Sequence, residues 1–320
     1  MSGHDEGARP RRTTTAVLTA ALAALLVSLA ACGPGGGEET VATAKRGPGV
    51  GRPPVVLGAG DFTEQLVLGQ LYTQALRAQG YHATLRPNIP STELLHGALA
   101  NGQIDGYAEY TGKLLTQVAL ITRRQSSAQA AYDTVRAFER RRGLTVLMRT
   151  PFSNVDALAV RASFAKQHQL VGVGDLAGLG SVKLGGPREF EARLTGLAGV
   201  KRSYGVPHVD FTALSIGQQY AALDRGRIQA ADVFTTDPAL RSGRYVVLED
   251  PRHVFGFGHI VPIFNRQVIA AEGASFARII NAVSSKLTTR AVQRLNAAVD
   301  VDKHSPADAA RTFLRSNPVR

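Results

Sequence analysis

The chain has 320 residues, a formal net charge of +12, a single cysteine and no tryptophan. One cysteine rules out an internal disulfide and any metal site built from several thiolates. A high positive charge is typical of nucleic-acid-binding proteins, but here the basic residues are spread along the chain without interleaved aromatic residues. We therefore expect no nucleic-acid partner and interpret the charge as a solvated surface.

The N-terminus has the parts of a secretory signal. Arginines precede an apolar run over residues 16–29, which is too short to span a bilayer comfortably, and small residues follow it. The run ends in Leu-Ala-Ala-Cys, which resembles the bacterial lipobox and implies a diacylglycerol thioether on Cys32. We predict a lipoprotein signal peptide over residues 1–31 and an extracytoplasmic protein that is anchored to a bacterial cell membrane through Cys32.

Residues 32–53 contain many glycines, several prolines and almost no large apolar side chains. Such a composition buries too little surface to offset the entropy of ordering, so it predicts a flexible tether. The folded part then begins near residue 54. Its length is large for one hydrophobic core and favours two lobes.

Strands and helices alternate after the tether. Residues 54–57 read as a buried strand, and Thr63 is placed to cap a helix that ends at Gly80. Residues 82–85 read as a second strand, and Ser91 caps a second helix. This alternation is typical of a parallel α/β sheet.

One pattern occurs twice in the chain, and the second copy begins 124 residues after the first. Each copy reads as a helix end, a glycine turn, a strand, and an aromatic-threonine pair where the strand stops. Ligands of open α/β sheets bind outside the carboxyl ends of the strands. The repeat therefore predicts two similar lobes that face each other across a cleft. The two copies are Ala98-Leu99, Gly102, Ile104, Tyr110-Thr111 and Ala222-Leu223, Gly226, Ile228, Phe234-Thr235.

Patterns of catalytic or metal-binding residues are weak. Neither His-Glu-x-x-His nor Gly-x-Ser-x-Gly occurs in the sequence. Gly172-x-Gly174 is similar to part of a dinucleotide fingerprint, but it follows a polar segment instead of a strand. We predict no enzyme, no catalytic residue, no cofactor and no metal, with a surface-anchored hydrolase as the remote alternative.

Several segments, in order and with matching spacing, resemble the substrate-binding proteins of glycine betaine/choline/carnitine ABC importers. The resemblance extends from about residue 55 to the C-terminus. It rests on Asp61-Phe62-Thr63-Glu64-Gln65, Ser91-Thr92-Glu93, Gly102 to Gly112, Asn154 to Arg161, Gly185 to Phe190, and Ala230 to Asp237.

This resemblance implies an α/β protein with a two-lobed, periplasmic-binding-protein-like fold of type II and a ligand cleft between its lobes. The first lobe is expected over residues 54–154 and 263–320, and the second over 155–262. The chain is expected to cross between them in two strands, near Val155–Arg161 and Ile260–Arg266. The function implied is the capture of a quaternary-ammonium osmolyte, such as glycine betaine or choline, and its delivery to an ABC permease by a monomer.

A quaternary ammonium donates no hydrogen bond and is held by the faces of aromatic rings. Without tryptophan, such a cage must use tyrosine or phenylalanine. Tyr110 and Phe234, on the two repeated strand ends, are the first candidates, and polar contacts are expected from residues near them. The full set of ligand-binding candidates is Thr63, Gln65, Tyr107, Tyr110, Thr111, Phe152, Asp156, Phe234, Thr235 and Phe257.

The chain departs from the family pattern near the expected ligand. Asp156 stands where many members have an aromatic residue, and Gly258 stands in place of a tyrosine. A carboxylate at Asp156 favours a cation or a ligand with an N–H, and Lys113 adds a positive charge at the rim. A different small amine, an amino-acid-like solute, or a role as the ligand sensor of a signalling partner therefore remain alternatives.

Overall fold

The computed structural model describes residues 47–206 and 208–319. The predicted signal peptide, Cys32 and most of the predicted tether lie outside these residues. None of the helices in the described part of the chain is both long and apolar enough to cross a membrane.

The predicted tether ends earlier than residue 53. The amide of Gly49 donates to the carbonyl of Gln79, and a guanidinium nitrogen of Arg52 donates to the carbonyl of Ala271. Gly49 also packs against the ring of Tyr81, where a Cβ would lie 2.4 Å from the ring. Glycine allows this close approach because it has no Cβ. These contacts show that residues 47–53 belong to the folded part of the chain.

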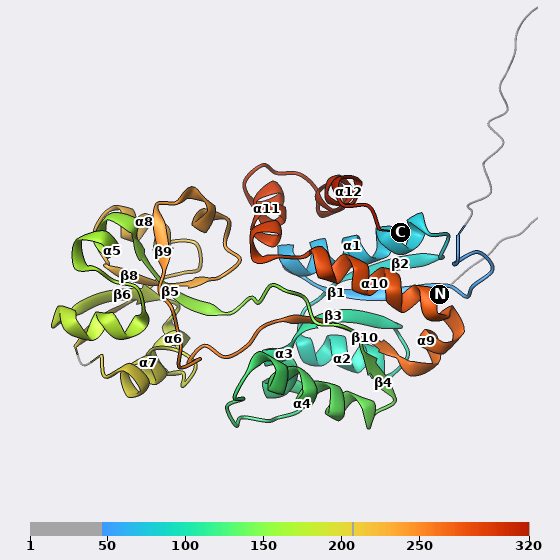
Figure 1. The fold of residues 1–320 in the computed structure, drawn as a ribbon, viewed down its shortest axis with the longest axis horizontal. Coiled ribbons are helices and arrows are strands. Elements are labelled where there is room, and N and C mark those ends of the chain that lie inside the picture. The colour runs from blue at the N-terminus through green and yellow to red at the C-terminus, as the bar shows by residue number, and fades with distance from the viewer. Residues whose placement is uncertain (1–46, 207, 320) are drawn as a thin grey trace, which may run out of the picture. The chain divides into compact units, whose positions relative to one another are not determined.

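The first lobe is built on a five-stranded sheet with the order β2-β1-β3-β10-β4 (Figure 1). Strand β1 pairs in parallel with β2 and β3, whereas β10 is antiparallel to β3 and β4. The sheet is thus completed by a strand from late in the chain. The bounds are Val55–Gly60 (β1), Ala83–Ile89 (β2), Gly106–Tyr110 (β3), Leu144–Val146 (β4) and Ile260–Asn265 (β10).

The second lobe has a sheet of the same design, with the order β7-β6-β8-β5-β9. Strand β6 pairs in parallel with β7 and β8, and β5 is antiparallel to β8 and β9. The predicted α/β class and two-lobed type II arrangement are therefore confirmed. The bounds are Asp156–Arg161 (β5), Val182–Gly186 (β6), Val209–Ala213 (β7), Ala230–Phe234 (β8) and Tyr245–Val247 (β9).

The repeated pattern occupies equivalent places in the two sheets. Strands β3 and β8 stop at Tyr110 and Phe234, and the glycine before each strand has a φ of 68°. The Asp105 side chain accepts a hydrogen bond from the amide of Val56 in the neighbouring β1. The Gln229 side chain likewise accepts from the amide of Lys183 in β6. The repeat is therefore structural, and it gives both lobes the same strand ends.

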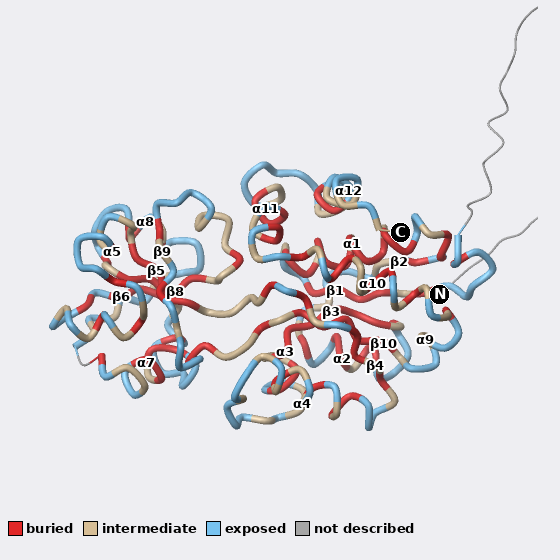
Figure 2. Tube along the Cα trace, in the orientation of Figure 1, coloured by how far each residue is buried: buried red, intermediate tan, exposed pale blue. Residues whose placement is uncertain are grey.

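Helices cover both faces of each sheet, and the buried residues follow the sheets (Figure 2). In the first lobe α1, α10, α11 and α12 pack on one face and α2 and α4 on the other. In the second lobe α5, α6 and α7 pack on one face and α8 on the other. The helices are Thr63–Ala78 (α1), Thr92–Ala100 (α2), Thr111–Lys113 (α3), Ala128–Arg140 (α4), Ala162–His168 (α5), Arg188–Ala192 (α6), Leu197–Tyr204 (α7), Gln219–Asp224 (α8), Arg266–Glu272 (α9), Ala274–Lys286 (α10), Thr289–Asp300 (α11) and Pro306–Ser316 (α12), with π-helical Leu114–Val118 and 3-10 turns at Val173–Leu179 and Pro238–Ser242.

The chain passes from the first sheet to the second between β4 and β5 and returns between β9 and β10. The two passing segments touch at an isolated antiparallel bridge between Ser153 and His259. The expected lobe boundary at residue 262 is too late, because Ile260 already pairs with Tyr110 of β3. The predicted strand at 260–266 corresponds to β10, which lies wholly in the first sheet.

Gly106→Ala should destabilise the protein by about 1–3 kcal/mol through overpacking. A Cβ at Gly106 would lie 2.1 Å from the ring of Phe264 and 2.7 Å from the carbonyl of Ile263, so both ring and backbone would have to move. Gly97→Ala is the matched control, because its Cβ would meet nothing within 4 Å and the residue lies in α2. Urea unfolding of both variants checks this, and equal stability of the two would contradict it.

Candidate functional site

The candidate residues come from the carboxyl ends of the central strands. Phe62 to Glu64 follow β1. Tyr110 is the last residue of β3 and Thr111 follows it, and Phe234 is the last residue of β8 and Thr235 follows it. Asp156 opens β5 and is paired with Phe234. The alternation of strands and helices therefore delivers ring, hydroxyl and carboxylate groups to the strand ends of both lobes.

Two rings of the first lobe form a surface that carries a cation. The rings of Phe62 and Tyr110 are stacked, with centroids 6.2 Å apart and an angle of 18° between their planes. The ammonium nitrogen of Lys113 lies over both, at 5.1 Å from the Phe62 centroid and 5.2 Å from the Tyr110 centroid. Phe62 is 40% exposed and Tyr110 is buried. This pair therefore has the geometry of a cation–π site that opens to solvent.

A buried carboxylate fixes the ring of Tyr110. Glu64 Oε1 accepts hydrogen bonds from the Tyr110 hydroxyl at 2.8 Å and from the Asn154 amide at 3.1 Å. Its Oε2 accepts from the Asn296 amide at 2.9 Å. Burial raises the pKa of Tyr110 well above its ordinary value, so the hydroxyl remains a donor to Glu64. Sequence reasoning missed both Glu64 and Phe62, although they flank the predicted Thr63.

In the second lobe, two carboxyl groups share one face of the sheet. Asp156 pairs with Phe234, and Asp232 lies two residues before Phe234 on β8, so the side chains of all three project to the same side. Asp156 is paired with the half-exposed guanidinium of Arg193 at 3.3 Å. Asp232 is 3% exposed, and its buried Oδ1 has no hydrogen-bond partner among the described residues.

Burial and, as the second-largest cause, repulsion by the Asp156 carboxylate raise the pKa of Asp232 to about 9. Burial also raises the pKa of Asp156, against the attraction of Arg193. The second lobe therefore holds one carboxyl whose ionisation is opposed by burial and by a neighbouring carboxylate, beside one that is paired with a cation. The sequence pointed to Asp156 alone, because the partner carboxyl depends on the register of β5 against β8.

Thr111 and Thr235 have matching structural roles. The Thr111 hydroxyl donates to the carbonyl of Phe257 at 3.0 Å, and the Thr235 hydroxyl donates to that of Ser153 at 2.7 Å. Thr235 Oγ1 also accepts from the amide of Val155. Each threonine therefore ties the end of a central strand to one of the passing segments, and its hydroxyl proton is already engaged.

Thr63 is not the cap of α1. Phe62 occupies the N-cap position, without a side-chain hydrogen bond, and Thr63 is the first helical residue. The Thr63 hydroxyl donates to Asp300 at 2.6 Å. Gln65 is buried, and its Nε2 has no partner among the described residues. Of the two polar candidates at this helix, Gln65 is the one with an unused donor.

None of the remaining aromatic candidates stacks on the Phe62–Tyr110 pair in the described part of the chain. Tyr107 is buried three residues before Tyr110, on the opposite face of β3, with its hydroxyl 3.1 Å from His96 Nδ1. Phe152 is fully buried in the core of the first lobe. Phe257 is partly buried against the apolar cluster that contains Tyr107, its ring is 4.8 Å from that of His253, and its carbonyl accepts from Thr111 beside Tyr110. Strand alternation and core packing explain these positions.

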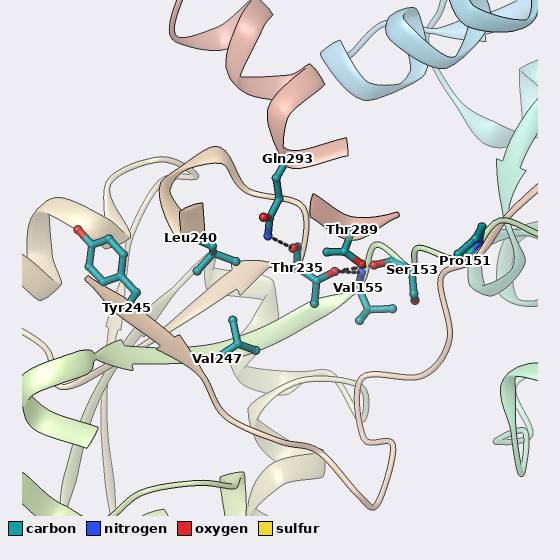
Figure 3. A pocket seen from close by; sticks show the side chains of 9 residues that line it. All are labelled: Pro151, Ser153, Val155, Thr235, Leu240, Tyr245, Val247, Thr289 and Gln293. Carbon is teal, nitrogen blue, oxygen red and sulfur yellow. Dashed lines mark hydrogen bonds between the residues drawn. The ribbon is translucent and has the colours of Figure 1, made fainter. Parts of the chain in front are cut away.

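A cavity of about 520 Å³ lies beside the passing segments (Figure 3). Gln293 of α11 donates to the carbonyl of Thr235 at its wall. Val247 lines the cavity and belongs to the face of the second sheet opposite Asp156, and neither Phe62, Tyr110 and Lys113 nor Asp156 and Asp232 are among the lining residues. The cavity is therefore distinct from both candidate clusters. It is lined by Pro151, Ser153, Val155, Thr235, Leu240, Tyr245, Val247, Thr289 and Gln293.

Within residues 47–206 and 208–319, no group of three or more histidine, cysteine, aspartate or glutamate side chains is placed to hold a metal ion.

A family profile described as the substrate-binding domain of ABC-type glycine betaine transport systems matches residues 53–316. The chain belongs to this family. It is 30% identical to a glycine-betaine-binding protein of Pseudomonas aeruginosa, over 82% of this chain and 87% of that one. It is 25% identical to the glycine betaine-binding protein YehZ of Escherichia coli, over 82% and 90% of the two chains.

Solved structures agree with this assignment. A crystal structure described as a glycine betaine/carnitine/choline ABC transporter superposes with a TM-score of 0.76 at 25% identity, covering 82% of this chain and 98% of that one. The family predicted from the sequence is therefore confirmed, and it is a family of transport proteins that bind substrates.

Asp232→Asn should stabilise the protein, and the gain should grow with pH. A carboxyl whose pKa rises from 3.8 to about 9 on folding binds more protons in the folded state between these values, so the free energy of unfolding falls as pH rises through that window. Asparagine does not titrate. The difference in free energy of unfolding between variant and wild type should therefore increase over the same pH range, as measured by urea unfolding.

Asp175→Asn is the control for this measurement. The amides of Gly172 and Val171 lower the pKa of Asp175 in the folded protein. Its carboxylate therefore stabilises the fold at pH values above its pKa in the unfolded chain, and this stabilisation is lost in acid. That variant should lose stability at neutral pH. A pH-independent effect of Asp232→Asn would show that Asp232 is ionised in the folded protein.

Proposed function

We propose that the protein is an extracytoplasmic receptor that captures a quaternary-ammonium osmolyte and delivers it to an ABC permease, without catalysis. The observation that carries this proposal is the ammonium of Lys113 over the rings of Phe62 and Tyr110. A cation of the chain itself already uses this surface. A ligand's quaternary ammonium fits the same surface because it needs ring faces and offers no hydrogen to donate.

The relatives support the chemical class of the ligand. Their names and descriptions refer to glycine betaine, carnitine and choline, all of which carry a trimethylammonium group. Each ring face contributes roughly 0.5–2 kcal/mol to holding such a group. Phe62 and Tyr110 supply two faces, and we propose Phe234, which is half-buried at the end of β8, as a third from the opposite lobe.

Closure of the lobes would bring these surfaces together, because the chain passes between the lobes twice and both passages lie beside the candidate residues. Thr111 and Thr235 join the strand ends to the passages. Among the sequence-predicted residues we therefore assign ligand contact to Tyr110, Phe234 and Gln65. We assign the two threonines to the hinge.

The site of action follows from the N-terminal sequence. We propose that the signal over residues 1–31 is removed and that Cys32 carries a diacylglycerol group. The protein would then work as a monomer at the outer surface of the cell membrane, where the permease receives the ligand. A positive net charge is compatible with an anionic lipid surface.

A second ligand class is favoured by the carboxyl pair of the second lobe. Asp156 is the carboxyl of the pair that carries a charge, beside the guanidinium of Arg193, and a carboxylate accepts hydrogen bonds from a ligand with an N–H or O–H donor. A small amine or an amino-acid-like solute meets that demand better than a fully methylated ammonium.

Titration calorimetry against glycine betaine, choline, carnitine and proline betaine tests the function directly. We expect a dissociation constant on the order of micromolar for at least one of them. Dimethylglycine, which differs from glycine betaine by one methyl and retains an N–H when protonated, is the matched probe for the second class. Binding of dimethylglycine alone would favour the second class, and absence of any binding by the folded protein would contradict both.

Phe62→Leu should weaken binding of the quaternary ammonium by roughly 2- to 30-fold, because it removes one ring face while keeping a large apolar side chain. Phe62→Tyr keeps the ring and should bind within about 2-fold of wild type. Calorimetry with the tightest ligand of the panel measures both. Equal affinities of the leucine variant and wild type would remove Phe62 from the site.

A further inference from the structure

The position of Lys113 has a consequence for ligand selection. Its ammonium lies over the same two rings that are proposed to hold the ligand, at 5.1 and 5.2 Å from their centroids. No carboxylate lies within 4.0 Å of it in the described part of the chain. Burial raises the pKa of Glu109 against the attraction of Lys113, and hydrogen bonds followed by Lys113 lower the pKa of Glu93, so both acidic groups feel its charge without forming an ion pair with it. The two rings are therefore the groups that its ammonium contacts without an ion pair in the described part of the chain.

A ligand's ammonium and the Lys113 ammonium cannot occupy one ring surface together, because like charges repel and the surface is only two rings wide. The rings themselves are held, since Tyr110 is fixed by Glu64 and stacks on Phe62. The lysine is the movable partner. It has a long flexible stem and lies in a single short helical turn that is followed by a π-helical segment.

We propose that Lys113 is a resident cation that selects zwitterionic ligands over purely cationic ones. This inference rests on the proposed function. A cation without a carboxylate must displace Lys113 and leaves its ammonium without a partner. A betaine displaces the same ammonium and offers it a carboxylate a few bonds from the quaternary nitrogen. The charge that opposes one class of ligand therefore assists the other.

Glycine betaine and choline form the matched pair of probes, because they share the trimethylammonium group and differ in carboxylate against hydroxyl. In the wild type we expect glycine betaine to bind more tightly than choline. In Lys113→Met we expect choline to bind more tightly than in wild type and glycine betaine to bind no better, so that the ratio of the two affinities shifts by about tenfold or more toward choline. Lys113→Arg should keep the wild-type order.

Lys166→Met is the control for net charge, because Lys166 is exposed on α5 in the second lobe and makes no comparable ring contact in the described structure. A general loss of folding lowers both affinities together, whereas the inference requires the two ligands to respond differently. If glycine betaine binds and Lys113→Met leaves the affinity ratio unchanged, the role of Lys113 is wrong and the proposed function stands. If neither probe binds to the wild type or to Lys113→Met, the inference falls, and the proposed function falls with it only when carnitine and proline betaine also fail to bind.

Discussion

Each sheet is completed by an antiparallel strand that follows a passage from the other lobe. Strand β10 pairs with β3 after the return passage, and β5 pairs with β8 after the outward one. Because both strands lie next to the centre of their sheets, neither lobe has a complete core without the passage. The passages are thus fixed at the ends of β3 and β8. The repeated aromatic-threonine pairs stand at these ends, which places the proposed ligand contacts and the proposed hinge in adjacent residues.

Glu64 links these functions within the first lobe. Its carboxylate, buried without an ionic partner among the described residues, is satisfied by neutral donors from β3, from the outward passage and from α11. Asn296 also donates to the carbonyl of Thr236 in the second lobe. A buried carboxylate with unmet hydrogen bonds is costly, so this network holds the Tyr110 ring, the passage and α11 in one arrangement. The position of the ring surface is therefore coupled to contacts between the lobes.

Much of the fold follows from local sequence signals. The helix end, glycine turn and buried isoleucine are set by neighbouring residues, so both copies of the repeat were placed correctly. The lobe boundary was missed, because a buried strand such as β10 has the same apolar sequence whichever sheet it joins. Tyr107 and Tyr110 differ by three positions, so strand alternation puts them on opposite faces, and that signal was available before the structure.

The site was less predictable than the fold. Phe62 reads as a loop residue in sequence, and its pairing with Tyr110 depends on how the end of β1 lies against the end of β3. Asp232 reads as an ordinary strand residue until the register beside Asp156 is known. These contacts join residues that are distant in the chain, and no local pattern encodes them.

A crystal structure of the protein with glycine betaine would test the central claim most directly. The account predicts the trimethylammonium group over the rings of Phe62 and Tyr110, with the Lys113 ammonium displaced from them. Glycine betaine in the cavity lined by Thr235 and Gln293, with Lys113 still over both rings, would contradict it.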